Sequence, residues 1–442
     1  MPTHARHTLP GESGVARANR RYDLLPMMTT TTDRNSKKPL GSVVASLDEL
    51  AEIGRDLDGG VTRVAWSPEL FEAYAWVRDR LLALGLSVEI DAAGNLLARW
   101  EVGSGLPVLV GSHLDTVPAG GRFDGVLGVV AAVHAVELLE SEGFEPERPL
   151  WIAAFMDEEG TRFNTALFGS RAFAGGDLRE LGDRVDASGT TLREAMTAAG
   201  LDLERAGDAR QVDQIGAYLE LHIEQGRVLE AESRDIGVVT SIVGLRGYRV
   251  RLHGEANHAG TTPMQLRRDA FVGAARIALE LRDHARARKD VTTNVGKIAV
   301  TPGGANVVPG LADFTIDARA ATPESIADVE RLVRETVARV AMEEGLEFDL
   351  QQTLSLDPLE LDPRLVDTVE RAAISEGAST MRMSSGAGHD AMVVGRHVPA
   401  AMFFVPSRGG ISHSPDEFSD PSHVELGMRV LAAALRDLLR AE

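Results

Sequence analysis

The chain of 442 residues contains no cysteine. This absence excludes a disulfide scaffold, thiol catalysis and cysteine-type zinc sites, and it fits a reducing, cytoplasmic compartment. Long hydrophobic runs are also missing, because no stretch approaches the ~20 apolar residues of a membrane-spanning helix. The sequence therefore predicts a protein without a membrane partner, in which any metal site must use histidine and carboxylate ligands.

Positive charge is scarce, since 46 Lys and Arg face 66 Asp and Glu, for a formal charge of −20. Such a balance disfavours nucleic acid and anionic membranes as partners. The chain also lacks a Gly-x-Ser-x-Gly elbow, a P-loop and a Gly-x-Gly-x-x-Gly after a strand. The glycine-rich stretch Gly303–Pro309 has no Lys-Ser/Thr to hold phosphate. We expect a small-molecule substrate and no nucleic-acid partner.

Residues 1–40 differ from the rest, because they show no hydrophobic period and contain a run of threonines after Met27-Met28. They lack the apolar region of a secretory signal and the amphipathic helix of an organellar transit peptide. We interpret them as a disordered tail, or as the product of a start codon assigned too early, with the real one near Met27.

The remaining chain predicts an α/β protein with a discontinuous catalytic domain. A helix should start at Ser67-Pro68 and close at Gly85. Two apolar runs, 107–113 and 150–156, read as buried strands on either side of a helix near 129–139. Strand, helix and strand in this order indicate a mainly parallel sheet.

The order of the expected strands and helices changes after about residue 235, which predicts an inserted domain. Its β-α-β-β-α-β order, with helices expected near 263–286 and 323–345, suits a ferredoxin-like α+β sandwich. Candidate site residues lie on both sides of it, so the catalytic domain should comprise 41–236 and 356–442, with 237–355 as the insert.

Polar side chains follow the two buried strands. His113 ends the first run, and Glu158 and Glu159 follow the second. The carboxyl ends of parallel strands meet at one edge of a sheet, where sites are assembled. Further candidates are Asp124 before the helix, His222 after another apolar run, and His413 among Ser and Pro. Three histidines with two carboxylates, Asp124 and Glu159, supply what two zinc-like ions require, and Glu158 is left as a general base.

Each of these residues also has a less specific interpretation. Any one histidine could be a surface or core residue, and Asp124 could cap the following helix. Glu158 and Glu159 could be solvated acids opening a loop, but carboxylates at the tip of a buried strand repel one another unless a cation compensates. We expect Asp115 to accept the second N–H of His113, as carboxylates do beside metal-bound imidazoles.

Motifs in order from about residue 45 to the end resemble one enzyme family. They are Gly111-Ser-His-Leu-Asp-Thr116, Gly121-Arg-Phe-Asp-Gly125, Asp157-Glu-Glu-Gly160, Glu220-Leu-His-Ile-Glu-Gln-Gly226, Asn257-His-Ala-Gly-Thr-Thr-Pro-Met264, Gly304-Ala-Asn-Val-Val-Pro309, Ile316-Asp-Ala-Arg319, Gly386-Ala-Gly-His-Asp-Ala391 and Ser412-His413-Ser. The series is similar to the di-zinc N-carbamoyl-L-amino-acid amidohydrolases, allantoate amidohydrolases and β-ureidopropionases, an aminoacylase-like branch of the dinuclear metallopeptidases. Peptidase branches usually carry an acid where His222 stands, so His222 favours the carbamoyl or ureido branch.

The resemblance implies roles for individual residues. Asp124 would bridge two ions, with His113 and His222 on one, and Glu159 and His413 on the other. The ions would be zinc, or else manganese, cobalt or nickel. Glu158 would act as the base and His258, on the insert, would stabilise the oxyanion. Asn306 and Arg319, with Gln225 nearby, would bind the substrate carboxylate. The catalytic domain would have an aminopeptidase-like fold, and the insert would also form a homodimer.

Three functions remain open from the sequence. The first is a hydrolase of the ureido C–N bond of N-carbamoyl-L-amino acids, with allantoate or β-ureidopropionate as alternative substrates. The second is a dinuclear N-acyl-amino-acid deacylase or exopeptidase, which would expect an acid in place of His222. The third is a metal-free binding relative, which is disfavoured because all five ligands and the base are present.

Overall fold

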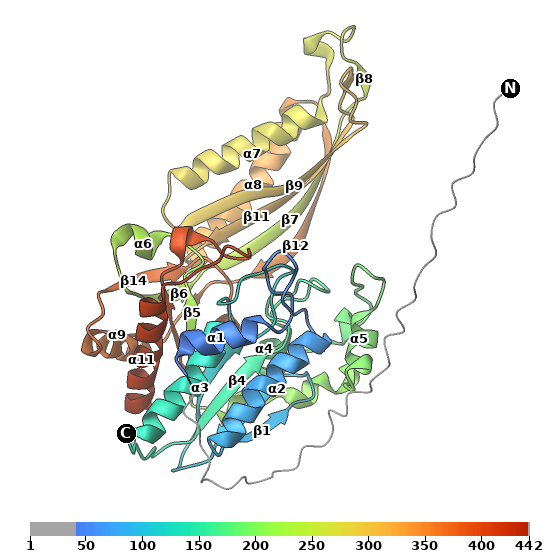
Figure 1. The fold of residues 1–442 in the computed structure, drawn as a ribbon. Coiled ribbons are helices and arrows are strands. Elements are labelled where there is room, and N and C mark those ends of the chain that lie inside the picture. The colour runs from blue at the N-terminus through green and yellow to red at the C-terminus, as the bar shows by residue number, and fades with distance from the viewer. Residues whose placement is uncertain (1–40, 441–442) are drawn as a thin grey trace, which may run out of the picture.

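The computed structural model describes residues 41–440, in which a nine-stranded and a four-stranded sheet each have a hydrophobic core of their own. The expected tail, residues 1–40, lies outside the described residues. Figure 1 shows the larger α/β part at the bottom and the smaller α+β part extending above it. No helix in the described range is long and apolar enough to cross a membrane.

The larger part is built on a nine-stranded sheet with the order β1-β2-β4-β3-β5-β15-β6-β13, in which β14 also pairs with β6. Its central strands, each buried along its whole length, are β3 (Val108–His113), β4 (Leu150–Phe155), β5 (Ala217–Ile223) and β15 (Ala400–Val405). These four run parallel to one another. The remaining strands are β1 (Ser87–Ile90), β2 (Leu96–Trp100), β6 (Ile236–Ile242), β13 (Leu359–Glu360) and β14 (Thr380–Ser385). The expected mainly parallel α/β sheet is confirmed.

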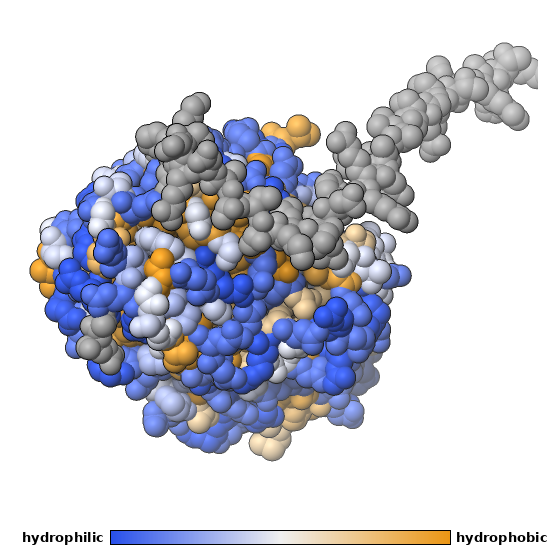
Figure 2. All heavy atoms as spheres, turned by 90° about the horizontal axis from the view of Figure 1, so that it is seen from below, coloured by the Kyte–Doolittle hydropathy of each residue, from blue (hydrophilic) through white to orange (hydrophobic). Residues whose placement is uncertain are grey.

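Helices pack around this sheet. They are α1 (Val43–Ala51), α2 (Pro68–Ala83), α3 (Val126–Ser141), α4 (Phe168–Phe173), α5 (Leu192–Ala198), α6 (Val228–Glu232), α9 (Pro363–Ser375), α10 (Asp390–Val394) and α11 (Pro421–Leu438), with short 3₁₀ turns η2 (Arg179–Leu181), η3 (Leu203–Ala209), η4 (Val212–Gln214) and η6 (Arg408–Gly410). Helix α2 starts as predicted, because the Ser67 side chain accepts a hydrogen bond from the Leu70 amide and Pro68 is its first residue. Figure 2 views the molecule from below, where hydrophilic residues predominate and hydrophobic ones are scattered.

The smaller part is a four-stranded antiparallel sheet with the order β12-β7-β11-β9. Its elements in chain order are β7 (Gly244–His253), α7 (Ala270–Arg286), β9 (Val291–Thr301), β11 (Leu311–Ala320), α8 (Pro323–Glu343) and β12 (Glu347–Leu356). This is the β-α-β-β-α-β order expected for a ferredoxin-like sandwich. A two-stranded pair, β8 (Asn257–His258) with β10 (Val307–Val308), lies at its far tip beside the turn η5 (Met264–Leu266).

Two boundaries differ from the sequence expectations. Helix α7 begins at Ala270, not near 263, because the Asp269 side chain caps it by accepting from two backbone amides. Strand β6 belongs to the large sheet, so the sheet of the insert starts at Gly244. We propose that the insert is a domain whose sheet spans Gly244 to Leu356, which starts seven residues after and ends one residue beyond the expected 237–355.

The chain enters and leaves the insert through an antiparallel ribbon formed by β6 with β13 and by β7 with β12. Ile242 pairs with Leu359 in β6 and β13, and Leu245 pairs with Leu356 in β7 and β12. Two residues lie between these pairs on each strand, so both pairs have the same register. Arg246 ties the ribbon together, donating hydrogen bonds to the Leu356 carbonyl at 2.7 Å and to Asp357 at 2.6 Å.

A buried histidine in α3 predicts acid sensitivity of the larger part. His134 is 6% exposed and its Nε2 lies 2.9 Å from Ser46 Oγ of α1. Burial, with a smaller contribution from Arg80, lowers the pKa of His134 to about 4. Between pH 6.5 and 4 the unfolded state therefore binds a proton that the folded state does not, so stability falls as pH decreases through this range.

We expect the metal-free His134→Gln variant to lose less stability than the metal-free wild type between pH 7.5 and 5. Glutamine can keep a hydrogen bond to Ser46 but does not titrate. The expected difference is at most about 2 kcal/mol, from the 1.36 kcal/mol per pKa unit that linkage gives. Urea unfolding at both pH values measures it, and equal pH dependence in the two proteins would refute the role of His134.

Candidate metal centre and active site

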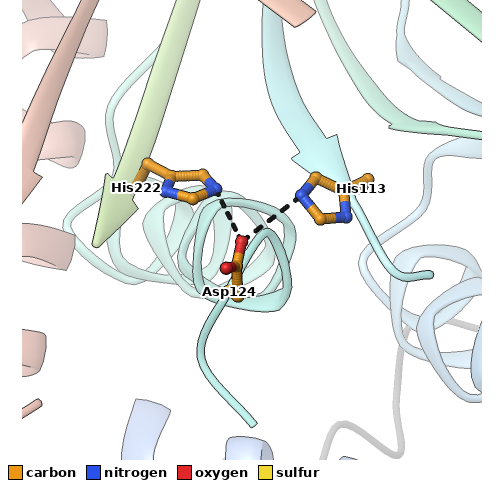
Figure 3. A group of neighbouring side chains, drawn as sticks. All are labelled: His113, Asp124 and His222. Atoms are coloured by element: carbon orange, nitrogen blue, oxygen red, sulfur yellow. Dashed lines mark ion pairs between the residues drawn. The ribbon is translucent and has the colours of Figure 1, made fainter. Parts of the chain in front are cut away.

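Residues from separate elements converge at the carboxyl edge of the large sheet (Figure 3). His113 is the last residue of β3, His222 lies near the end of β5, and Asp124 precedes α3. Asp124 Oδ1 lies 3.2 Å from His222 Nε2 and 3.7 Å from His113 Nε2. One carboxylate oxygen thus faces two imidazole nitrogens, and all three residues are buried.

The second oxygen of Asp124 faces another pair of groups. His413 Nε2 lies 3.4 Å from Asp124 Oδ2 and 3.4 Å from Glu159 Oε1. The five predicted ligands therefore form two groups with ligand spacing, His113–Asp124–His222 and Asp124–Glu159–His413. Asp124 belongs to both groups, as a bridging carboxylate would.

The tautomers of the buried histidines fit a cation. His113 Nδ1 lies 2.9 Å from the Asp115 carbonyl and His222 Nδ1 lies 2.9 Å from the Ile223 carbonyl. A carbonyl only accepts, so each Nδ1 carries a proton and each Nε2 is left as the possible metal ligand. The buried His113 Nε2 has no hydrogen-bond partner, whereas His222 Nε2 lies 3.1 Å from the Gly125 amide. The lone pair of His113 Nε2 faces the Asp124 carboxylate and repels it unless a cation lies between them, so the donor set fits a divalent metal.

The pKa shifts of Glu159 and His222 also indicate a cation site. Burial, then the charge of Asp124, raises the pKa of Glu159 to about 8. Although burial opposes it, the hydrogen bond and charge of Asp124 raise the pKa of His222 to about 9. Without a metal, protons have to neutralise this cluster, and a divalent cation would take their place.

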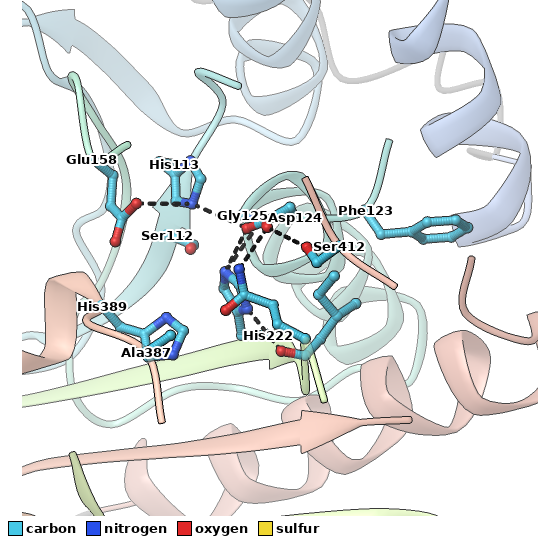
Figure 4. Close-up of polar contacts among 12 residues, drawn as sticks. Ser112, His113, Phe123, Asp124, Gly125, Glu158, His222, Ala387, His389 and Ser412 are labelled. Carbon is cyan, nitrogen blue, oxygen red and sulfur yellow. Dashed lines mark hydrogen bonds and ion pairs between the residues drawn. The ribbon is translucent and has the colours of Figure 1, made fainter. Parts of the chain in front are cut away.

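Glu158 lies beside the centre without belonging to either ligand group. Its Oε2 lies 3.6 Å from His113 Nε2 (Figure 4). Burial, then Asp390 and Glu159, raise the pKa of Glu158 well above its usual value. The Asp115 carboxylate accepts hydrogen bonds from the amides of Glu158 and Glu159 at 3.2 and 3.1 Å, so it orients both.

One expectation and one alternative interpretation of hydrogen bonding were wrong. The Asp115 carboxylate lies 3.7 Å from His113 Nδ1, because it is turned to the two glutamate amides and the Asp115 carbonyl takes the imidazole proton instead. Asp124 does not cap α3. The N-cap is Gly125, with no side-chain cap, because the Asp124 carboxylate faces the histidines. Gly125 has φ 67°, and a Cβ there would collide with the His113 ring.

The residues expected to bind substrate are dispersed. Gln225 lies in the centre and donates from Nε2 to Asp124 Oδ2 at 2.7 Å. Arg319, at the ribbon end of β11, donates to the Gly386 carbonyl at 2.8 Å and pairs with Asp317 at 2.8 Å. His258 and Asn306 lie at the far tip of the insert, where β8 meets β10, away from the metal ligands (Figure 1).

A third buried set of side chains, Glu220, His222 and His389, also has ligand spacing. His389 lies in the glycine loop before α10. The Glu220 carboxylate, however, accepts hydrogen bonds from Ser112 at 2.8 Å, Tyr218 at 3.1 Å and the Ala391 amide at 3.0 Å. Both carboxylate oxygens therefore accept hydrogen bonds within the protein. We interpret Glu220 as a support for the strands that carry His113 and His222.

Sequence reasoning missed Glu220 and Glu417 as parts of the centre. Glu220 stands two residues before His222, so it points to the same face of β5, which was a usable signal. Glu417 has no comparable signal, because it lies in a loop with no period. Its contacts appear only once residues 121–125 and 411–418 are seen side by side.

An α/β sheet with two ligand groups and a free glutamate at its carboxyl edge defines the class of metal-dependent hydrolases. Residues 109–437 match the model of Peptidase family M20/M25/M40. An N-carbamoyl-L-amino-acid amidohydrolase of Paenarthrobacter aurescens is 41% identical, covering 89% of this chain and 97% of the relative. An allantoate amidohydrolase of Bacillus subtilis (strain 168) is 37% identical, covering 90% and 96%.

Solved structures agree with these relatives. An amidase of the hydantoinase/carbamoylase family from Burkholderia multivorans superposes with a TM-score of 0.83 at 36% identity, covering 89% of this chain and 96% of the other. The chain belongs to Peptidase family M20/M25/M40, whose enzymes hydrolyse C–N bonds and depend on metal. The resemblance inferred from the motifs and the expectation of an enzyme are confirmed.

Proposed function

We propose that this protein hydrolyses the ureido C–N bond of N-carbamoyl-L-amino acids at a dinuclear metal centre, with zinc as the first candidate and manganese, cobalt or nickel as alternatives. The observation that carries the proposal is the pair of ligand groups that share Asp124, with an imidazole, His222, where peptidases carry an acid. The 41% identity to an N-carbamoyl-L-amino-acid amidohydrolase supports the substrate class.

The five ligands are His113, Asp124, Glu159, His222 and His413. Two divalent ions bound there would lower the pKa of a water molecule and polarise the ureido carbonyl. Glu158, held by Asp115, takes a proton from the attacking water and returns it to the leaving nitrogen. Cleavage of a carbamoyl group yields the amino acid, carbon dioxide and ammonia.

The insert contributes the remaining roles in this proposal. Arg319 and Asn306, with Gln225, bind the substrate carboxylate, and His258 stabilises the oxyanion. His258 and Asn306 reach a metal centre only if the tip of the insert approaches one, in its own chain or in a second subunit. We propose a homodimer formed by the insert, whose strands β9 and β12 are sheet edges with exposed Ile298 and Phe348. Sedimentation of a monomer alone would refute it.

Substrate preference tests the proposed function. Metal-loaded enzyme is expected to hydrolyse N-carbamoyl-L-methionine or a similar apolar L-substrate, with the D-enantiomer essentially inert. The matched comparison is allantoate, because an allantoate amidohydrolase is 37% identical to this chain. A kcat/KM for allantoate above that of every carbamoyl amino acid would replace the substrate and keep the chemistry. Turnover of N-acyl amino acids or peptides alone would refute the proposal.

Replacing Arg319 by alanine is expected to weaken carboxylate substrates by about 10-fold or more in kcat/KM, because a charge-assisted pair is lost. The corresponding substrate amides, which lack the charge, should lose much less. Kinetics on acid and amide pairs measure the difference. Equal losses for both would mean that Arg319 acts through its contacts with Gly386 and Asp317 instead.

A further inference from the structure

Glu417 joins the two loops that carry Asp124 and His413. It is only 4% exposed, although it lies in a surface loop. Its Oε1 accepts hydrogen bonds from the Phe123 amide at 2.9 Å and the Asp124 amide at 3.1 Å. Its Oε2 accepts a hydrogen bond from Ser412 Oγ at 2.7 Å. One buried carboxylate therefore holds the backbone of one ligand loop and a side chain of the other.

Ser412 extends this connection to a metal ligand. Its hydroxyl lies 2.8 Å from Asp124 Oδ2, the oxygen that faces His413 (Figure 4). The hydroxyl is shared between the carboxylates of Glu417 and Asp124. Ser412 thus connects Glu417 to the Asp124 oxygen of the group formed with Glu159 and His413, which Gln225 also contacts.

The His413 loop depends on such an anchor. The His413 side chain is 49% exposed, whereas those of His113 and His222 are 1% exposed at the ends of buried strands. His413 also has a left-handed backbone, with φ 54°, which costs energy in a residue other than glycine. Packing fixes His113 and His222, but the position of His413 has to be fixed by contacts of its loop.

The opposite loop leaves room for the Glu417 carboxylate. A Cβ on Gly121 would fall far inside the van der Waals distance of Glu417 Oε1. The rings of Phe123 and Phe418, two residues after Gly121 and one after Glu417, pack edge to face with centroids 5.8 Å apart. The two loops thus meet through a carboxylate in a glycine-lined space and an aromatic pair beside it.

We propose that Glu417 is a positioning residue of the metal centre: it holds the Asp124 and His413 loops together and thereby sets the affinity of the Asp124–Glu159–His413 group for its ion. This inference rests on the proposed dinuclear function. Residues that orient metal ligands typically contribute about 10–100-fold to metal affinity. The larger effect should fall on the ion of this group, because the other ion also has His113 and His222, which are held by their own strands.

Calorimetric titration of metal-free enzyme with zinc tests the proposal. Wild type is expected to bind two ions, and Glu417→Ala to bind the ion of the Asp124–Glu159–His413 group about 10–100-fold more weakly, with a much smaller change for the other ion. Glu417→Gln should restore most of the affinity, because its amide oxygen can accept from both backbone amides and its nitrogen can donate to Ser412. Asp416→Ala is the matched control, an exposed acid next in sequence, and should titrate as wild type.

The other outcomes contradict either the role of Glu417 or the dinuclear function. Glu417→Ala binding two ions with unchanged affinity would overturn the role of Glu417 alone, whereas wild type binding fewer than two ions would overturn the dinuclear function. Equal weakening of both ions with a lower melting temperature would show a general structural role and also overturn the inference. Gly121→Ala displaces the Glu417 carboxylate and is expected to reproduce the selective loss, which provides the test if Glu417→Ala does not fold.

Discussion

Replacing Glu158 by glutamine is expected to lower kcat by about 10²–10⁴-fold and to leave the fold and metal content unchanged. Glutamine has nearly the same shape, so the amide of residue 158 can still donate to Asp115. The side chain no longer accepts and returns a proton, which is the function we assign to it. Steady-state kinetics, with metal analysis and circular dichroism of the same preparation, measure the effect.

Glu159→Gln is the matched control, because it makes the same chemical change one residue further along. Glu159 faces His413 at 3.4 Å and belongs to a ligand group, whereas Glu158 belongs to none. The control should therefore bind less metal, and excess metal should partly restore its activity. If Glu158→Gln lost metal and Glu159→Gln kept it, the roles assigned to the two neighbouring glutamates would be reversed.

Removing metal with a strong chelator is expected to abolish turnover, and a divalent transition metal should restore it. The ligand set contains imidazole and carboxylate groups but no thiolate, which suits zinc, manganese, cobalt and nickel. Activity measured after dialysis, and after addition of each metal in turn, identifies the most effective ion. Full activity in the chelator, with less than one metal per chain, would exclude the dinuclear centre.

Asp124→Ala extends this test to the shared ligand. Since Asp124 is the only residue in both metal-ligand groups assigned here, its loss should weaken both ions, whereas His413→Ala should weaken one. Inductively coupled plasma analysis of the purified variants reports the number of ions per chain. An Asp124→Ala protein that retained two ions would show that the carboxylate does not bridge.

Much of the fold and the centre could be predicted, because local patterns carry them. The central strands are apolar along their length, and a polar residue at the end of such a run must either face a site or remain unsatisfied. His113 and Glu159 stand out for that reason. The start of α7 was misplaced because Pro263 and Asp269 both suit a helix start, and only the side-chain bonds of Asp269 decide between them.

Other features depend on tertiary structure and could not be predicted. The contacts of Glu417 arise between residues almost 300 positions apart in sequence, |i−j| being 294 for its bond to Phe123. The distance of His258 from the metal ligands depends on how the insert is oriented. The motif around His258 carries no information on that orientation. The motifs thus indicated the candidate site residues, but they did not indicate which of these residues lie close together within one chain.

The ribbon between the two parts has a mechanical consequence. The strand pairs on both sides of the crossing resist sliding of the two segments along each other, and Arg246 cross-links the segments there. Bending and twisting of the ribbon remain the soft deformations. If the ribbon bends, the insert rotates about it, and each residue of the insert is displaced in proportion to its distance from the ribbon. Arg319, close to the ribbon, would stay nearly in place while His258, at the far tip, travels furthest.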